Sequence, residues 1–71
     1  MSKQVLAPMA GTMWKVLVKA GDTVNVGDTV AILESMKMEI PIESEHAGTV
    51  ATVDAPEGKV VDEGAPVVTL A

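Results

Sequence analysis

The chain has 71 residues, no cysteine and a net charge of −5 at pH 7. The lack of cysteine excludes disulfides, zinc–thiolate sites and thiol nucleophiles, and the negative charge disfavours binding to nucleic acid or to an anionic membrane. Because the N-terminal residues contain neither a signal peptide nor a long apolar span, we expect a cytoplasmic protein that does not enter a membrane and whose partners are proteins.

The first half of the chain is predicted to form short strands separated by glycine turns. A valine-rich segment at 14–18 leads towards Gly21, a short extended piece leads towards Gly27, and a further extended segment covers 30–33. No window has apolar residues at the 3.6-residue spacing of an amphipathic helix. Since the chain has no Phe or Tyr, its core must be aliphatic, and its many valines favour strands. These features predict an all-β fold with strands of about four to seven residues.

The segment Ser35-Met36-Lys37-Met38 marks a chain reversal that lacks the usual turn residues. It joins two apolar runs in AILESMKMEIPI, yet it contains no Gly, Pro, Asn or Asp. Met36 and Met38 lie two positions apart, on the same side of an extended chain, and neither can be fully buried at a tight tip. Exposed apolar side chains around one lysine indicate a docking site rather than an ordinary surface turn.

The second half of the chain repeats the first at a constant offset of 37 positions, without a gap. Residues of about 5–33 return as 42–70; for example, Ala10-Gly11-Thr12 returns as Ala47-Gly48-Thr49. The other identical pairs include Val16 and Val53, Gly21 and Gly58, Val24 and Val61, Gly27 and Gly64, Val30 and Val67, and Leu33 and Leu70. We therefore expect one domain, residues 1–71, built as a β-barrel or sandwich with pseudo-twofold symmetry and about four strands in each half. This symmetry also predicts that the two chain ends lie close together, on the side away from Lys37.

Lys37 is a poor nucleophile by itself. An exposed lysine is an ammonium ion at neutral pH, and it reacts only where burial or a neighbouring cation releases its proton. The charged neighbours of Lys37 in the sequence are Glu34 and Glu39, so no neighbouring cation is present to activate it. Any reaction at this lysine therefore needs activation by another protein.

Three stretches of the chain resemble the biotinyl domain of biotin-dependent carboxylases, the biotin carboxyl carrier family. They are VLAPMAGTM, VKAGDTVNVGD and ESMKMEI, and the resemblance extends over about residues 4–71. It implies a flattened barrel, or barrel-sandwich hybrid, of two four-stranded antiparallel sheets with quasi-twofold symmetry. The family pattern has proline at the position of Ala10 and alanine at that of Ser35. The gapless repeat indicates the thumbless type, without the insertion found in the bacterial acetyl-CoA carboxylase carrier.

The resemblance also implies a function and a site. Lys37 would carry covalent biotin, attached by a biotin protein ligase that uses ATP to activate biotin as an adenylate. The ligase would recognise the residues around this lysine, namely Glu34, Ser35, Met36, Met38 and Glu39. The domain would be a monomeric carrier and not an enzyme, with no catalytic or metal-binding residues. It would move a carboxyl group between a biotin carboxylase and a carboxyltransferase.

Two other functions remain open from the sequence. Lipoyl domains of 2-oxoacid dehydrogenases and glycine-cleavage systems share this fold and also carry a lysine at a hairpin tip, but methionine on both sides of Lys37 favours biotin. The second alternative is an unmodified interaction module. The remaining polar features indicate no further site: His46 stands alone beside a turn, and the glycine turns lead into strands rather than into the helix that a phosphate loop requires.

Overall fold

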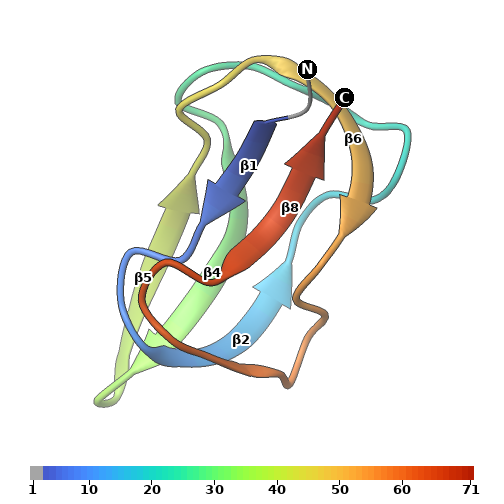
Figure 1. Cartoon of the computed structure of the whole chain (residues 1–71). Helices are drawn as coiled ribbons and strands as arrows, with labels where there is room; N and C mark the ends of the chain where they lie inside the picture. Colours follow the sequence, from blue (N-terminus) through green and yellow to red (C-terminus); the bar gives the residue numbers. More distant parts are fainter. Residues whose placement is uncertain (1–2) are drawn as a thin grey trace.

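The structure is a computed structural model that describes residues 3–71. Two antiparallel four-stranded sheets pack against each other, with strand orders β1-β8-β6-β3 and β5-β4-β2-β7 (Figure 1). The strands are β1 (Lys3–Leu6), β2 (Gly11–Val16), β3 (Thr23–Val24), β4 (Thr29–Ser35), β5 (Met38–Glu43), β6 (Gly48–Val53), β7 (Val60–Val61) and β8 (Pro66–Leu70). No helix within the described residues is long and apolar enough to cross a membrane. The predicted all-β fold of two four-stranded sheets is confirmed.

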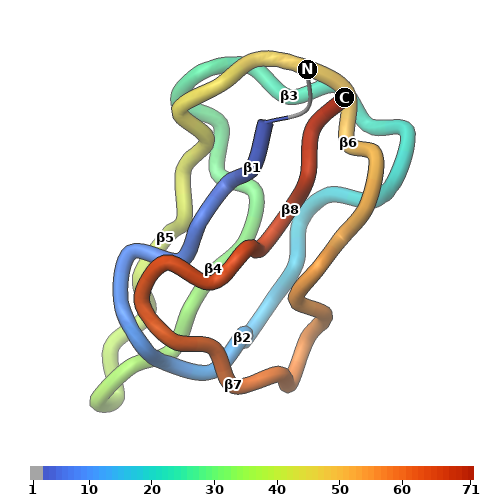
Figure 2. Tube along the Cα trace, in the orientation of Figure 1, coloured from blue at the N-terminus to red at the C-terminus, as the bar shows by residue number. Residues whose placement is uncertain are grey.

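The 37-residue offset of the sequence is also the symmetry of the fold. It converts β1 to β4 into β5 to β8, and it thereby converts one sheet order into the other. Backbone hydrogen bonds follow the same relation. The Gly21 N–H donates to the Val50 carbonyl at 2.8 Å, and the Gly58 N–H donates to the Met13 carbonyl at 2.7 Å. The short strands β3 and β7 accordingly lie at opposite ends of the molecule (Figure 2). The predicted quasi-twofold symmetry is confirmed.

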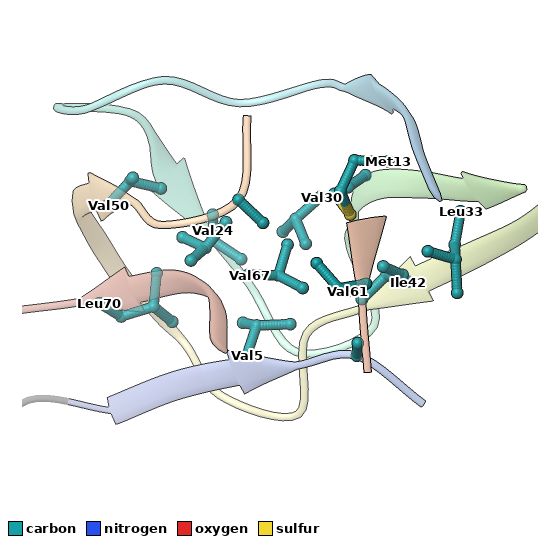
Figure 3. Packing of buried hydrophobic residues seen from close by; sticks show 14 residues of the cluster. Val5, Met13, Val24, Val30, Leu33, Ile42, Val50, Val61, Val67 and Leu70 are labelled. Carbon is teal, nitrogen blue, oxygen red and sulfur yellow. The ribbon is translucent and has the colours of Figure 1, made fainter. Parts of the chain in front are cut away.

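The core is aliphatic and fills the space between the two sheets (Figure 3). Its largest fully buried side chains are Met13, Leu33 and Leu70, with at most 1% of their surface exposed. Burying a side chain of this size contributes about 1.5–3 kcal/mol to folding. Most core positions are related in pairs by the repeat, so the two halves contribute to one core alike. These pairs are Val5 with Ile42, Met13 with Val50, Val24 with Val61, Val30 with Val67, Ala31 with Val68, and Leu33 with Leu70.

Four glycine turns bound the two shortest strands. Gly21, Gly27, Gly58 and Gly64 have φ angles of 97°, 91°, 89° and 84°, which residues other than glycine rarely adopt. Each glycine is the third residue of a four-residue turn closed by a backbone hydrogen bond, such as that from the Asp22 N–H to the Lys19 carbonyl at 3.0 Å. The predicted turns are confirmed. However, β3 and β7 have only two residues each, fewer than predicted, because each lies between two such turns.

The bounds of β2 differ from the segment 14–18 predicted from its valines. The strand begins at Gly11 because Gly11 and Thr12 pair with Val61 and Val60 of β7. The register with β4 shifts between Met13 and Lys15, so Trp14 is an extra residue in the ladder, a β-bulge. These features depend on pairing with distant residues, which local composition does not reveal.

The chain ends lie at one end of the molecule, and the β4–β5 turn lies at the other. Lys3 of β1 pairs with Leu70 of β8, at the top of the view in Figure 1. The β4–β5 turn lies at the lower left of the same view, and the long dimension of the molecule is 33 Å. The arrangement expected from the repeat, with the chain ends opposite Lys37, is confirmed for the described residues.

Candidate functional site

The β4–β5 turn places Lys37 at the tip of a two-residue hairpin. Ser35 and Met38 pair across the hairpin, which leaves Met36 and Lys37 as the connecting residues. Their φ angles are 50° and 66°, both in the left-handed region. Two consecutive left-handed residues are the signature of a type I′ turn, whose twist matches that of the flanking strands. The reversal predicted from the sequence is therefore a tight turn made without glycine or asparagine.

This turn costs stability. In the left-handed region the Cβ atom lies too close to the following carbonyl oxygen, which costs about 1–2 kcal/mol per residue, and this is why Asn-Gly is the usual sequence at such a tip. Met36 and Lys37 are held there by the flanking ladder, in which β4 and β5 pair from Ser35 and Met38 down to Thr29 and Glu43. Backbone strain that is retained in this way commonly marks a functional position.

The side chains at the tip project into solvent. Met36 is 90% exposed and Met38 is 64% exposed, the first of these being the most exposed large apolar side chain of the described residues. Lys37 is exposed as well. A groove lies along β1 and β5, but its lining runs from Pro41 to His46 on the β5 side and does not include Lys37. The amine is thus presented at the end of the molecule and not within a reaction pocket.

The structure brings all six predicted site residues together on one hairpin. Glu34 pairs directly with Glu39, one step below the pair formed by Ser35 and Met38. Both glutamates are exposed, and like charges directly across a ladder are mutually destabilising. Two acidic side chains therefore lie below the tip, and the tip itself presents two exposed methionines and one amine.

Gly11 supports this hairpin, and the sequence analysis assigned it no role. A Cβ atom at this position would lie 2.6 Å from the Glu34 carbonyl oxygen and 3.0 Å from Cγ of Leu33. Only glycine lets β2 approach β4 so closely beside the predicted recognition residues. The recurrence of Gly11 as Gly48 was the signal that could have identified it, since Gly48 also faces a close backbone atom, the Ala71 carbonyl oxygen at 3.0 Å.

The other polar features have structural roles at turns. The carboxylates of Asp22 and Asp28 accept hydrogen bonds from the backbone N–H groups of Lys19 and Asn25, at 3.0 and 2.9 Å. The backbone N–H of His46 donates to the Ser44 hydroxyl at 3.1 Å. No group of three or more potential metal ligands occurs within the described residues.

Comparisons with known proteins agree with this geometry. The family described as "Biotin-requiring enzyme" matches residues 3–70. The biotin/lipoyl attachment protein of Bacillus subtilis is 59% identical over 56 residues, covering 79% of this chain and 77% of that protein. The biotin carboxyl carrier protein of Streptococcus mutans is 46% identical over 65 residues, covering 92% of this chain and 50% of that protein.

The fold is also found within solved carboxylase structures. The urea carboxylase of Kluyveromyces lactis superimposes with a TM-score of 0.91 and 28% identity, over 100% of this chain and 6% of that chain. A single-chain, multi-domain long-chain acyl-CoA carboxylase superimposes with a TM-score of 0.87 and 28% identity, over 96% of this chain and 7% of that one. The chain therefore spans one small domain of these enzymes.

Proposed function

Because the chain belongs to the family of biotin-requiring domains, we propose that Lys37 is the residue that carries the biotin, as an amide on its Nζ atom. The predicted biotinyl domain, its function as a non-catalytic biotin carrier and its covalently attached biotin are confirmed by the family match and by the relatives. The lipoyl alternative is less supported. The attachment residue itself stays a prediction, and the geometry of the tip supports it.

The observation that carries the proposal is the isolated position of Lys37 at a rigid turn. Its amine is exposed at the end of a paired hairpin, between Met36 and Met38. Two of the other four lysines are engaged by the body of the domain: Nζ of Lys15 lies 5.1 Å from the centre of the Trp14 ring, and Nζ of Lys59 donates to the Asp54 carbonyl at 3.4 Å. A ligase that must select one amine among five therefore has a geometric basis for choosing Lys37.

The residues of the chain fit a covalently attached group at this position. Lys37 offers a primary amine and a long flexible side chain, and the type I′ turn fixes the direction in which that side chain leaves the domain. Bound biotin supplies a ureido nitrogen that can carry a carboxyl group. The domain holds that group by a covalent tether, which raises its effective concentration at each enzyme site the tether can reach.

The partners follow from the same proposal. A biotin protein ligase would read the two methionines, with Glu34, Ser35 and Glu39 beside them, and would supply the activation that Lys37 lacks. Biotin carboxylase and carboxyltransferase sites, like those of the carboxylases that share this domain, would load and unload the carried group. A monomer is proposed because the core of the described residues closes within one chain, and a cytoplasmic location is proposed with it.

Parallel labelling reactions test which group is attached. The chain is incubated with a biotin protein ligase, ATP and biotin, and separately with a lipoyl ligase, ATP and lipoate, with Lys37→Arg in both reactions. We expect biotin to be incorporated into the wild type and not into the variant, which keeps the charge but loses the primary amine. Incorporation of lipoate alone would move the assignment to a lipoyl carrier, and incorporation of neither group would favour an interaction module.

A further inference from the structure

The twofold relation permits a comparison between the two outer faces of one molecule. On the sheet formed by β1, β8, β6 and β3, the outward residues form a hydrogen-bonded polar row. The Gln4 side chain donates to the Thr69 hydroxyl at 3.5 Å, and the Thr69 hydroxyl donates to the Asp54 carboxylate at 2.5 Å. The Thr52 hydroxyl donates to the other oxygen of Asp54 at 3.1 Å. This face satisfies its polar groups internally.

The corresponding row on the other sheet is mainly apolar, and its one charged member is Lys15, whose Nζ atom lies 5.1 Å from the centre of the Trp14 ring. The 37-residue offset converts Gln4, Thr69, Thr52 and Asp54 into Pro41, Ile32, Lys15 and Leu17, and it converts the bulge residue Ala51 into Trp14. We call this second set, Trp14, Lys15, Leu17, Ile32 and Pro41, the apolar face. Lys15 pairs with Ile32, which in turn pairs with Pro41. Leu17 lies next to this row because its counterpart Asp54 bonds to the counterparts of Ile32 and Lys15.

Folding does not require the apolar character of this face. Trp14 is 42% exposed and Leu17 is 52% exposed, so neither belongs to the core. The opposite sheet has the same strand order and the same bulge, with Ala51 and Asp54 at these positions. Since the fold tolerates a polar row there, the exposed tryptophan and leucine are available for contact with something outside the domain. Tryptophan is also the residue type most enriched at the energetic centres of protein interfaces.

We propose that the apolar face docks the domain onto the biotin carboxylase that loads the carried group. The inference rests on the proposed function and names one of its partners by its chemistry. The partner surface would present apolar side chains to Trp14 and Leu17. It would also present a basic side chain to Glu34 and Glu39, which lie directly opposite each other, two ladder steps from Ile32 and Pro41 and on the same face of the sheet. Such a cation would relieve the repulsion between the two glutamates.

The apolar face lies on the sheet that contains the β4–β5 hairpin, below its tip. This position favours the biotin carboxylase over the ligase as the protein that binds there. The ligase forms a bond to Nζ of Lys37, so it must cover the tip of the hairpin. Ile32 lies four residues before Met36, about 13 Å along an extended strand, and Trp14 lies between the levels of Leu33 and Ile32. An enzyme that acts on the carried group at the far end of the flexible Lys37 tether does not have to cover the tip, because the tether can turn back along the domain. The enzyme then contacts the face of the sheet from which the hairpin extends.

The double variant Trp14→Ala/Leu17→Asn tests this surface. Alanine is the residue that the opposite sheet has at the position of Trp14, namely Ala51. Asparagine is an uncharged analogue of Asp54, which occupies the position of Leu17 there. The matched control, Gln4→Ala/Thr52→Ala, removes two exposed side chains from the polar row. All proteins are first biotinylated, and their melting temperatures are compared. Each is then supplied as substrate to a bacterial biotin carboxylase that carboxylates the wild type.

We expect the double variant to raise KM for the carrier by about fivefold or more, the size of an interface hot spot, with kcat within about twofold of the wild type. Its biotinylation rate and the behaviour of the control should stay within about twofold of the wild type. An unchanged KM, an equal rise in the control, or a rise in the ligase KM alone would overturn the proposal. If the wild type accepts no biotin, the proposed function itself fails, and the docking inference fails with it.

Discussion

At the scale of single residues, the backbone conformations of Met36 and Lys37 lower the stability of the domain but present both side chains to solvent. Both adopt left-handed backbone conformations that asparagine or glycine would adopt more readily, and Met36 is 90% exposed. Neither property helps the domain to fold. Both are explained if the tip must display an amine between two apolar side chains that another protein reads.

Met36→Asn separates these two roles. Asparagine tolerates the left-handed region better than methionine, so we expect the free energy of unfolding in urea to rise by about 0.5–1 kcal/mol. We expect the rate of biotinylation by the ligase to fall, because one of the two apolar recognition groups is lost. A variant that is biotinylated at the wild-type rate would show that Met36 is not read by the ligase. Val26→Asn, at another exposed apolar position, is the control and should not change that rate.

At the scale of elements, the position of the hairpin depends on the close approach of β2 to β4. Glu34 pairs with Thr12 on one side and with Glu39 on the other, so β4 is the middle strand of the three that meet near the tip. Gly11, at the start of β2, makes this approach possible. A small residue outside the recognition segment thus fixes the geometry of the segment.

Gly11→Ala should destabilise the domain by about 1–3 kcal/mol, because the added methyl group would lie 2.6 Å from a backbone oxygen that cannot move without disturbing the ladder. Gly48→Ala is the symmetry-matched control. Its nearest atom is 3.0 Å away, on the last residue of the chain, so its loss of stability should be smaller. Urea denaturation of both variants measures the difference. Equal losses, or a greater loss for Gly48→Ala, would contradict the role assigned to Gly11.

Much of the element order could be predicted from the sequence, and the exceptions have physical causes. The glycine turns and the tip at Lys37 were predictable because Gly21, Gly27 and the MKM segment each have a local signal. The start of β2, the bulge at Trp14 and the close contact at Gly11 were not, because each depends on pairing with a distant strand. The predicted site residues lie on one hairpin, and their roles stay a prediction. The left-handed conformation of Met36 and Lys37 was missed because it follows from the two-residue loop length, which the sequence does not fix.

At the scale of the whole molecule, the domain is a rigid body made of two equivalent halves. The repeat made this symmetry predictable, since a constant offset relates positions that need the same backbone conformation or the same burial. The repeat also matches Trp14 with Ala51, which marks one asymmetric position in the sequence. Only the strand pairing and hydrogen bonds show that Trp14, Leu17 and Ile32 lie on one face.

Because the core is symmetric, equivalent substitutions in its two halves should lower the free energy of unfolding by similar amounts. Leu33 and Leu70 occupy equivalent positions with no exposed surface, so Leu33→Ala and Leu70→Ala should each lower the free energy of unfolding by about 2–5 kcal/mol. We expect the two losses to agree within about 1 kcal/mol, by analogy with equivalent cavities. Leu6→Ala, at a position that is 48% exposed, is the control and should cost about 0.5 kcal/mol or less. Calorimetry or urea denaturation would reveal unequal halves if one leucine proved far more costly than the other.

The intact mass of the chain after exhaustive treatment with biotin protein ligase, ATP and biotin, followed by peptide mapping, tests most directly whether Lys37 is the carrier residue. We expect a single biotinyl addition, located on the peptide that contains Lys37. No addition, more than one addition, or an addition at Lys3, Lys15, Lys19 or Lys59 would contradict the assignment of the hairpin tip as the attachment site.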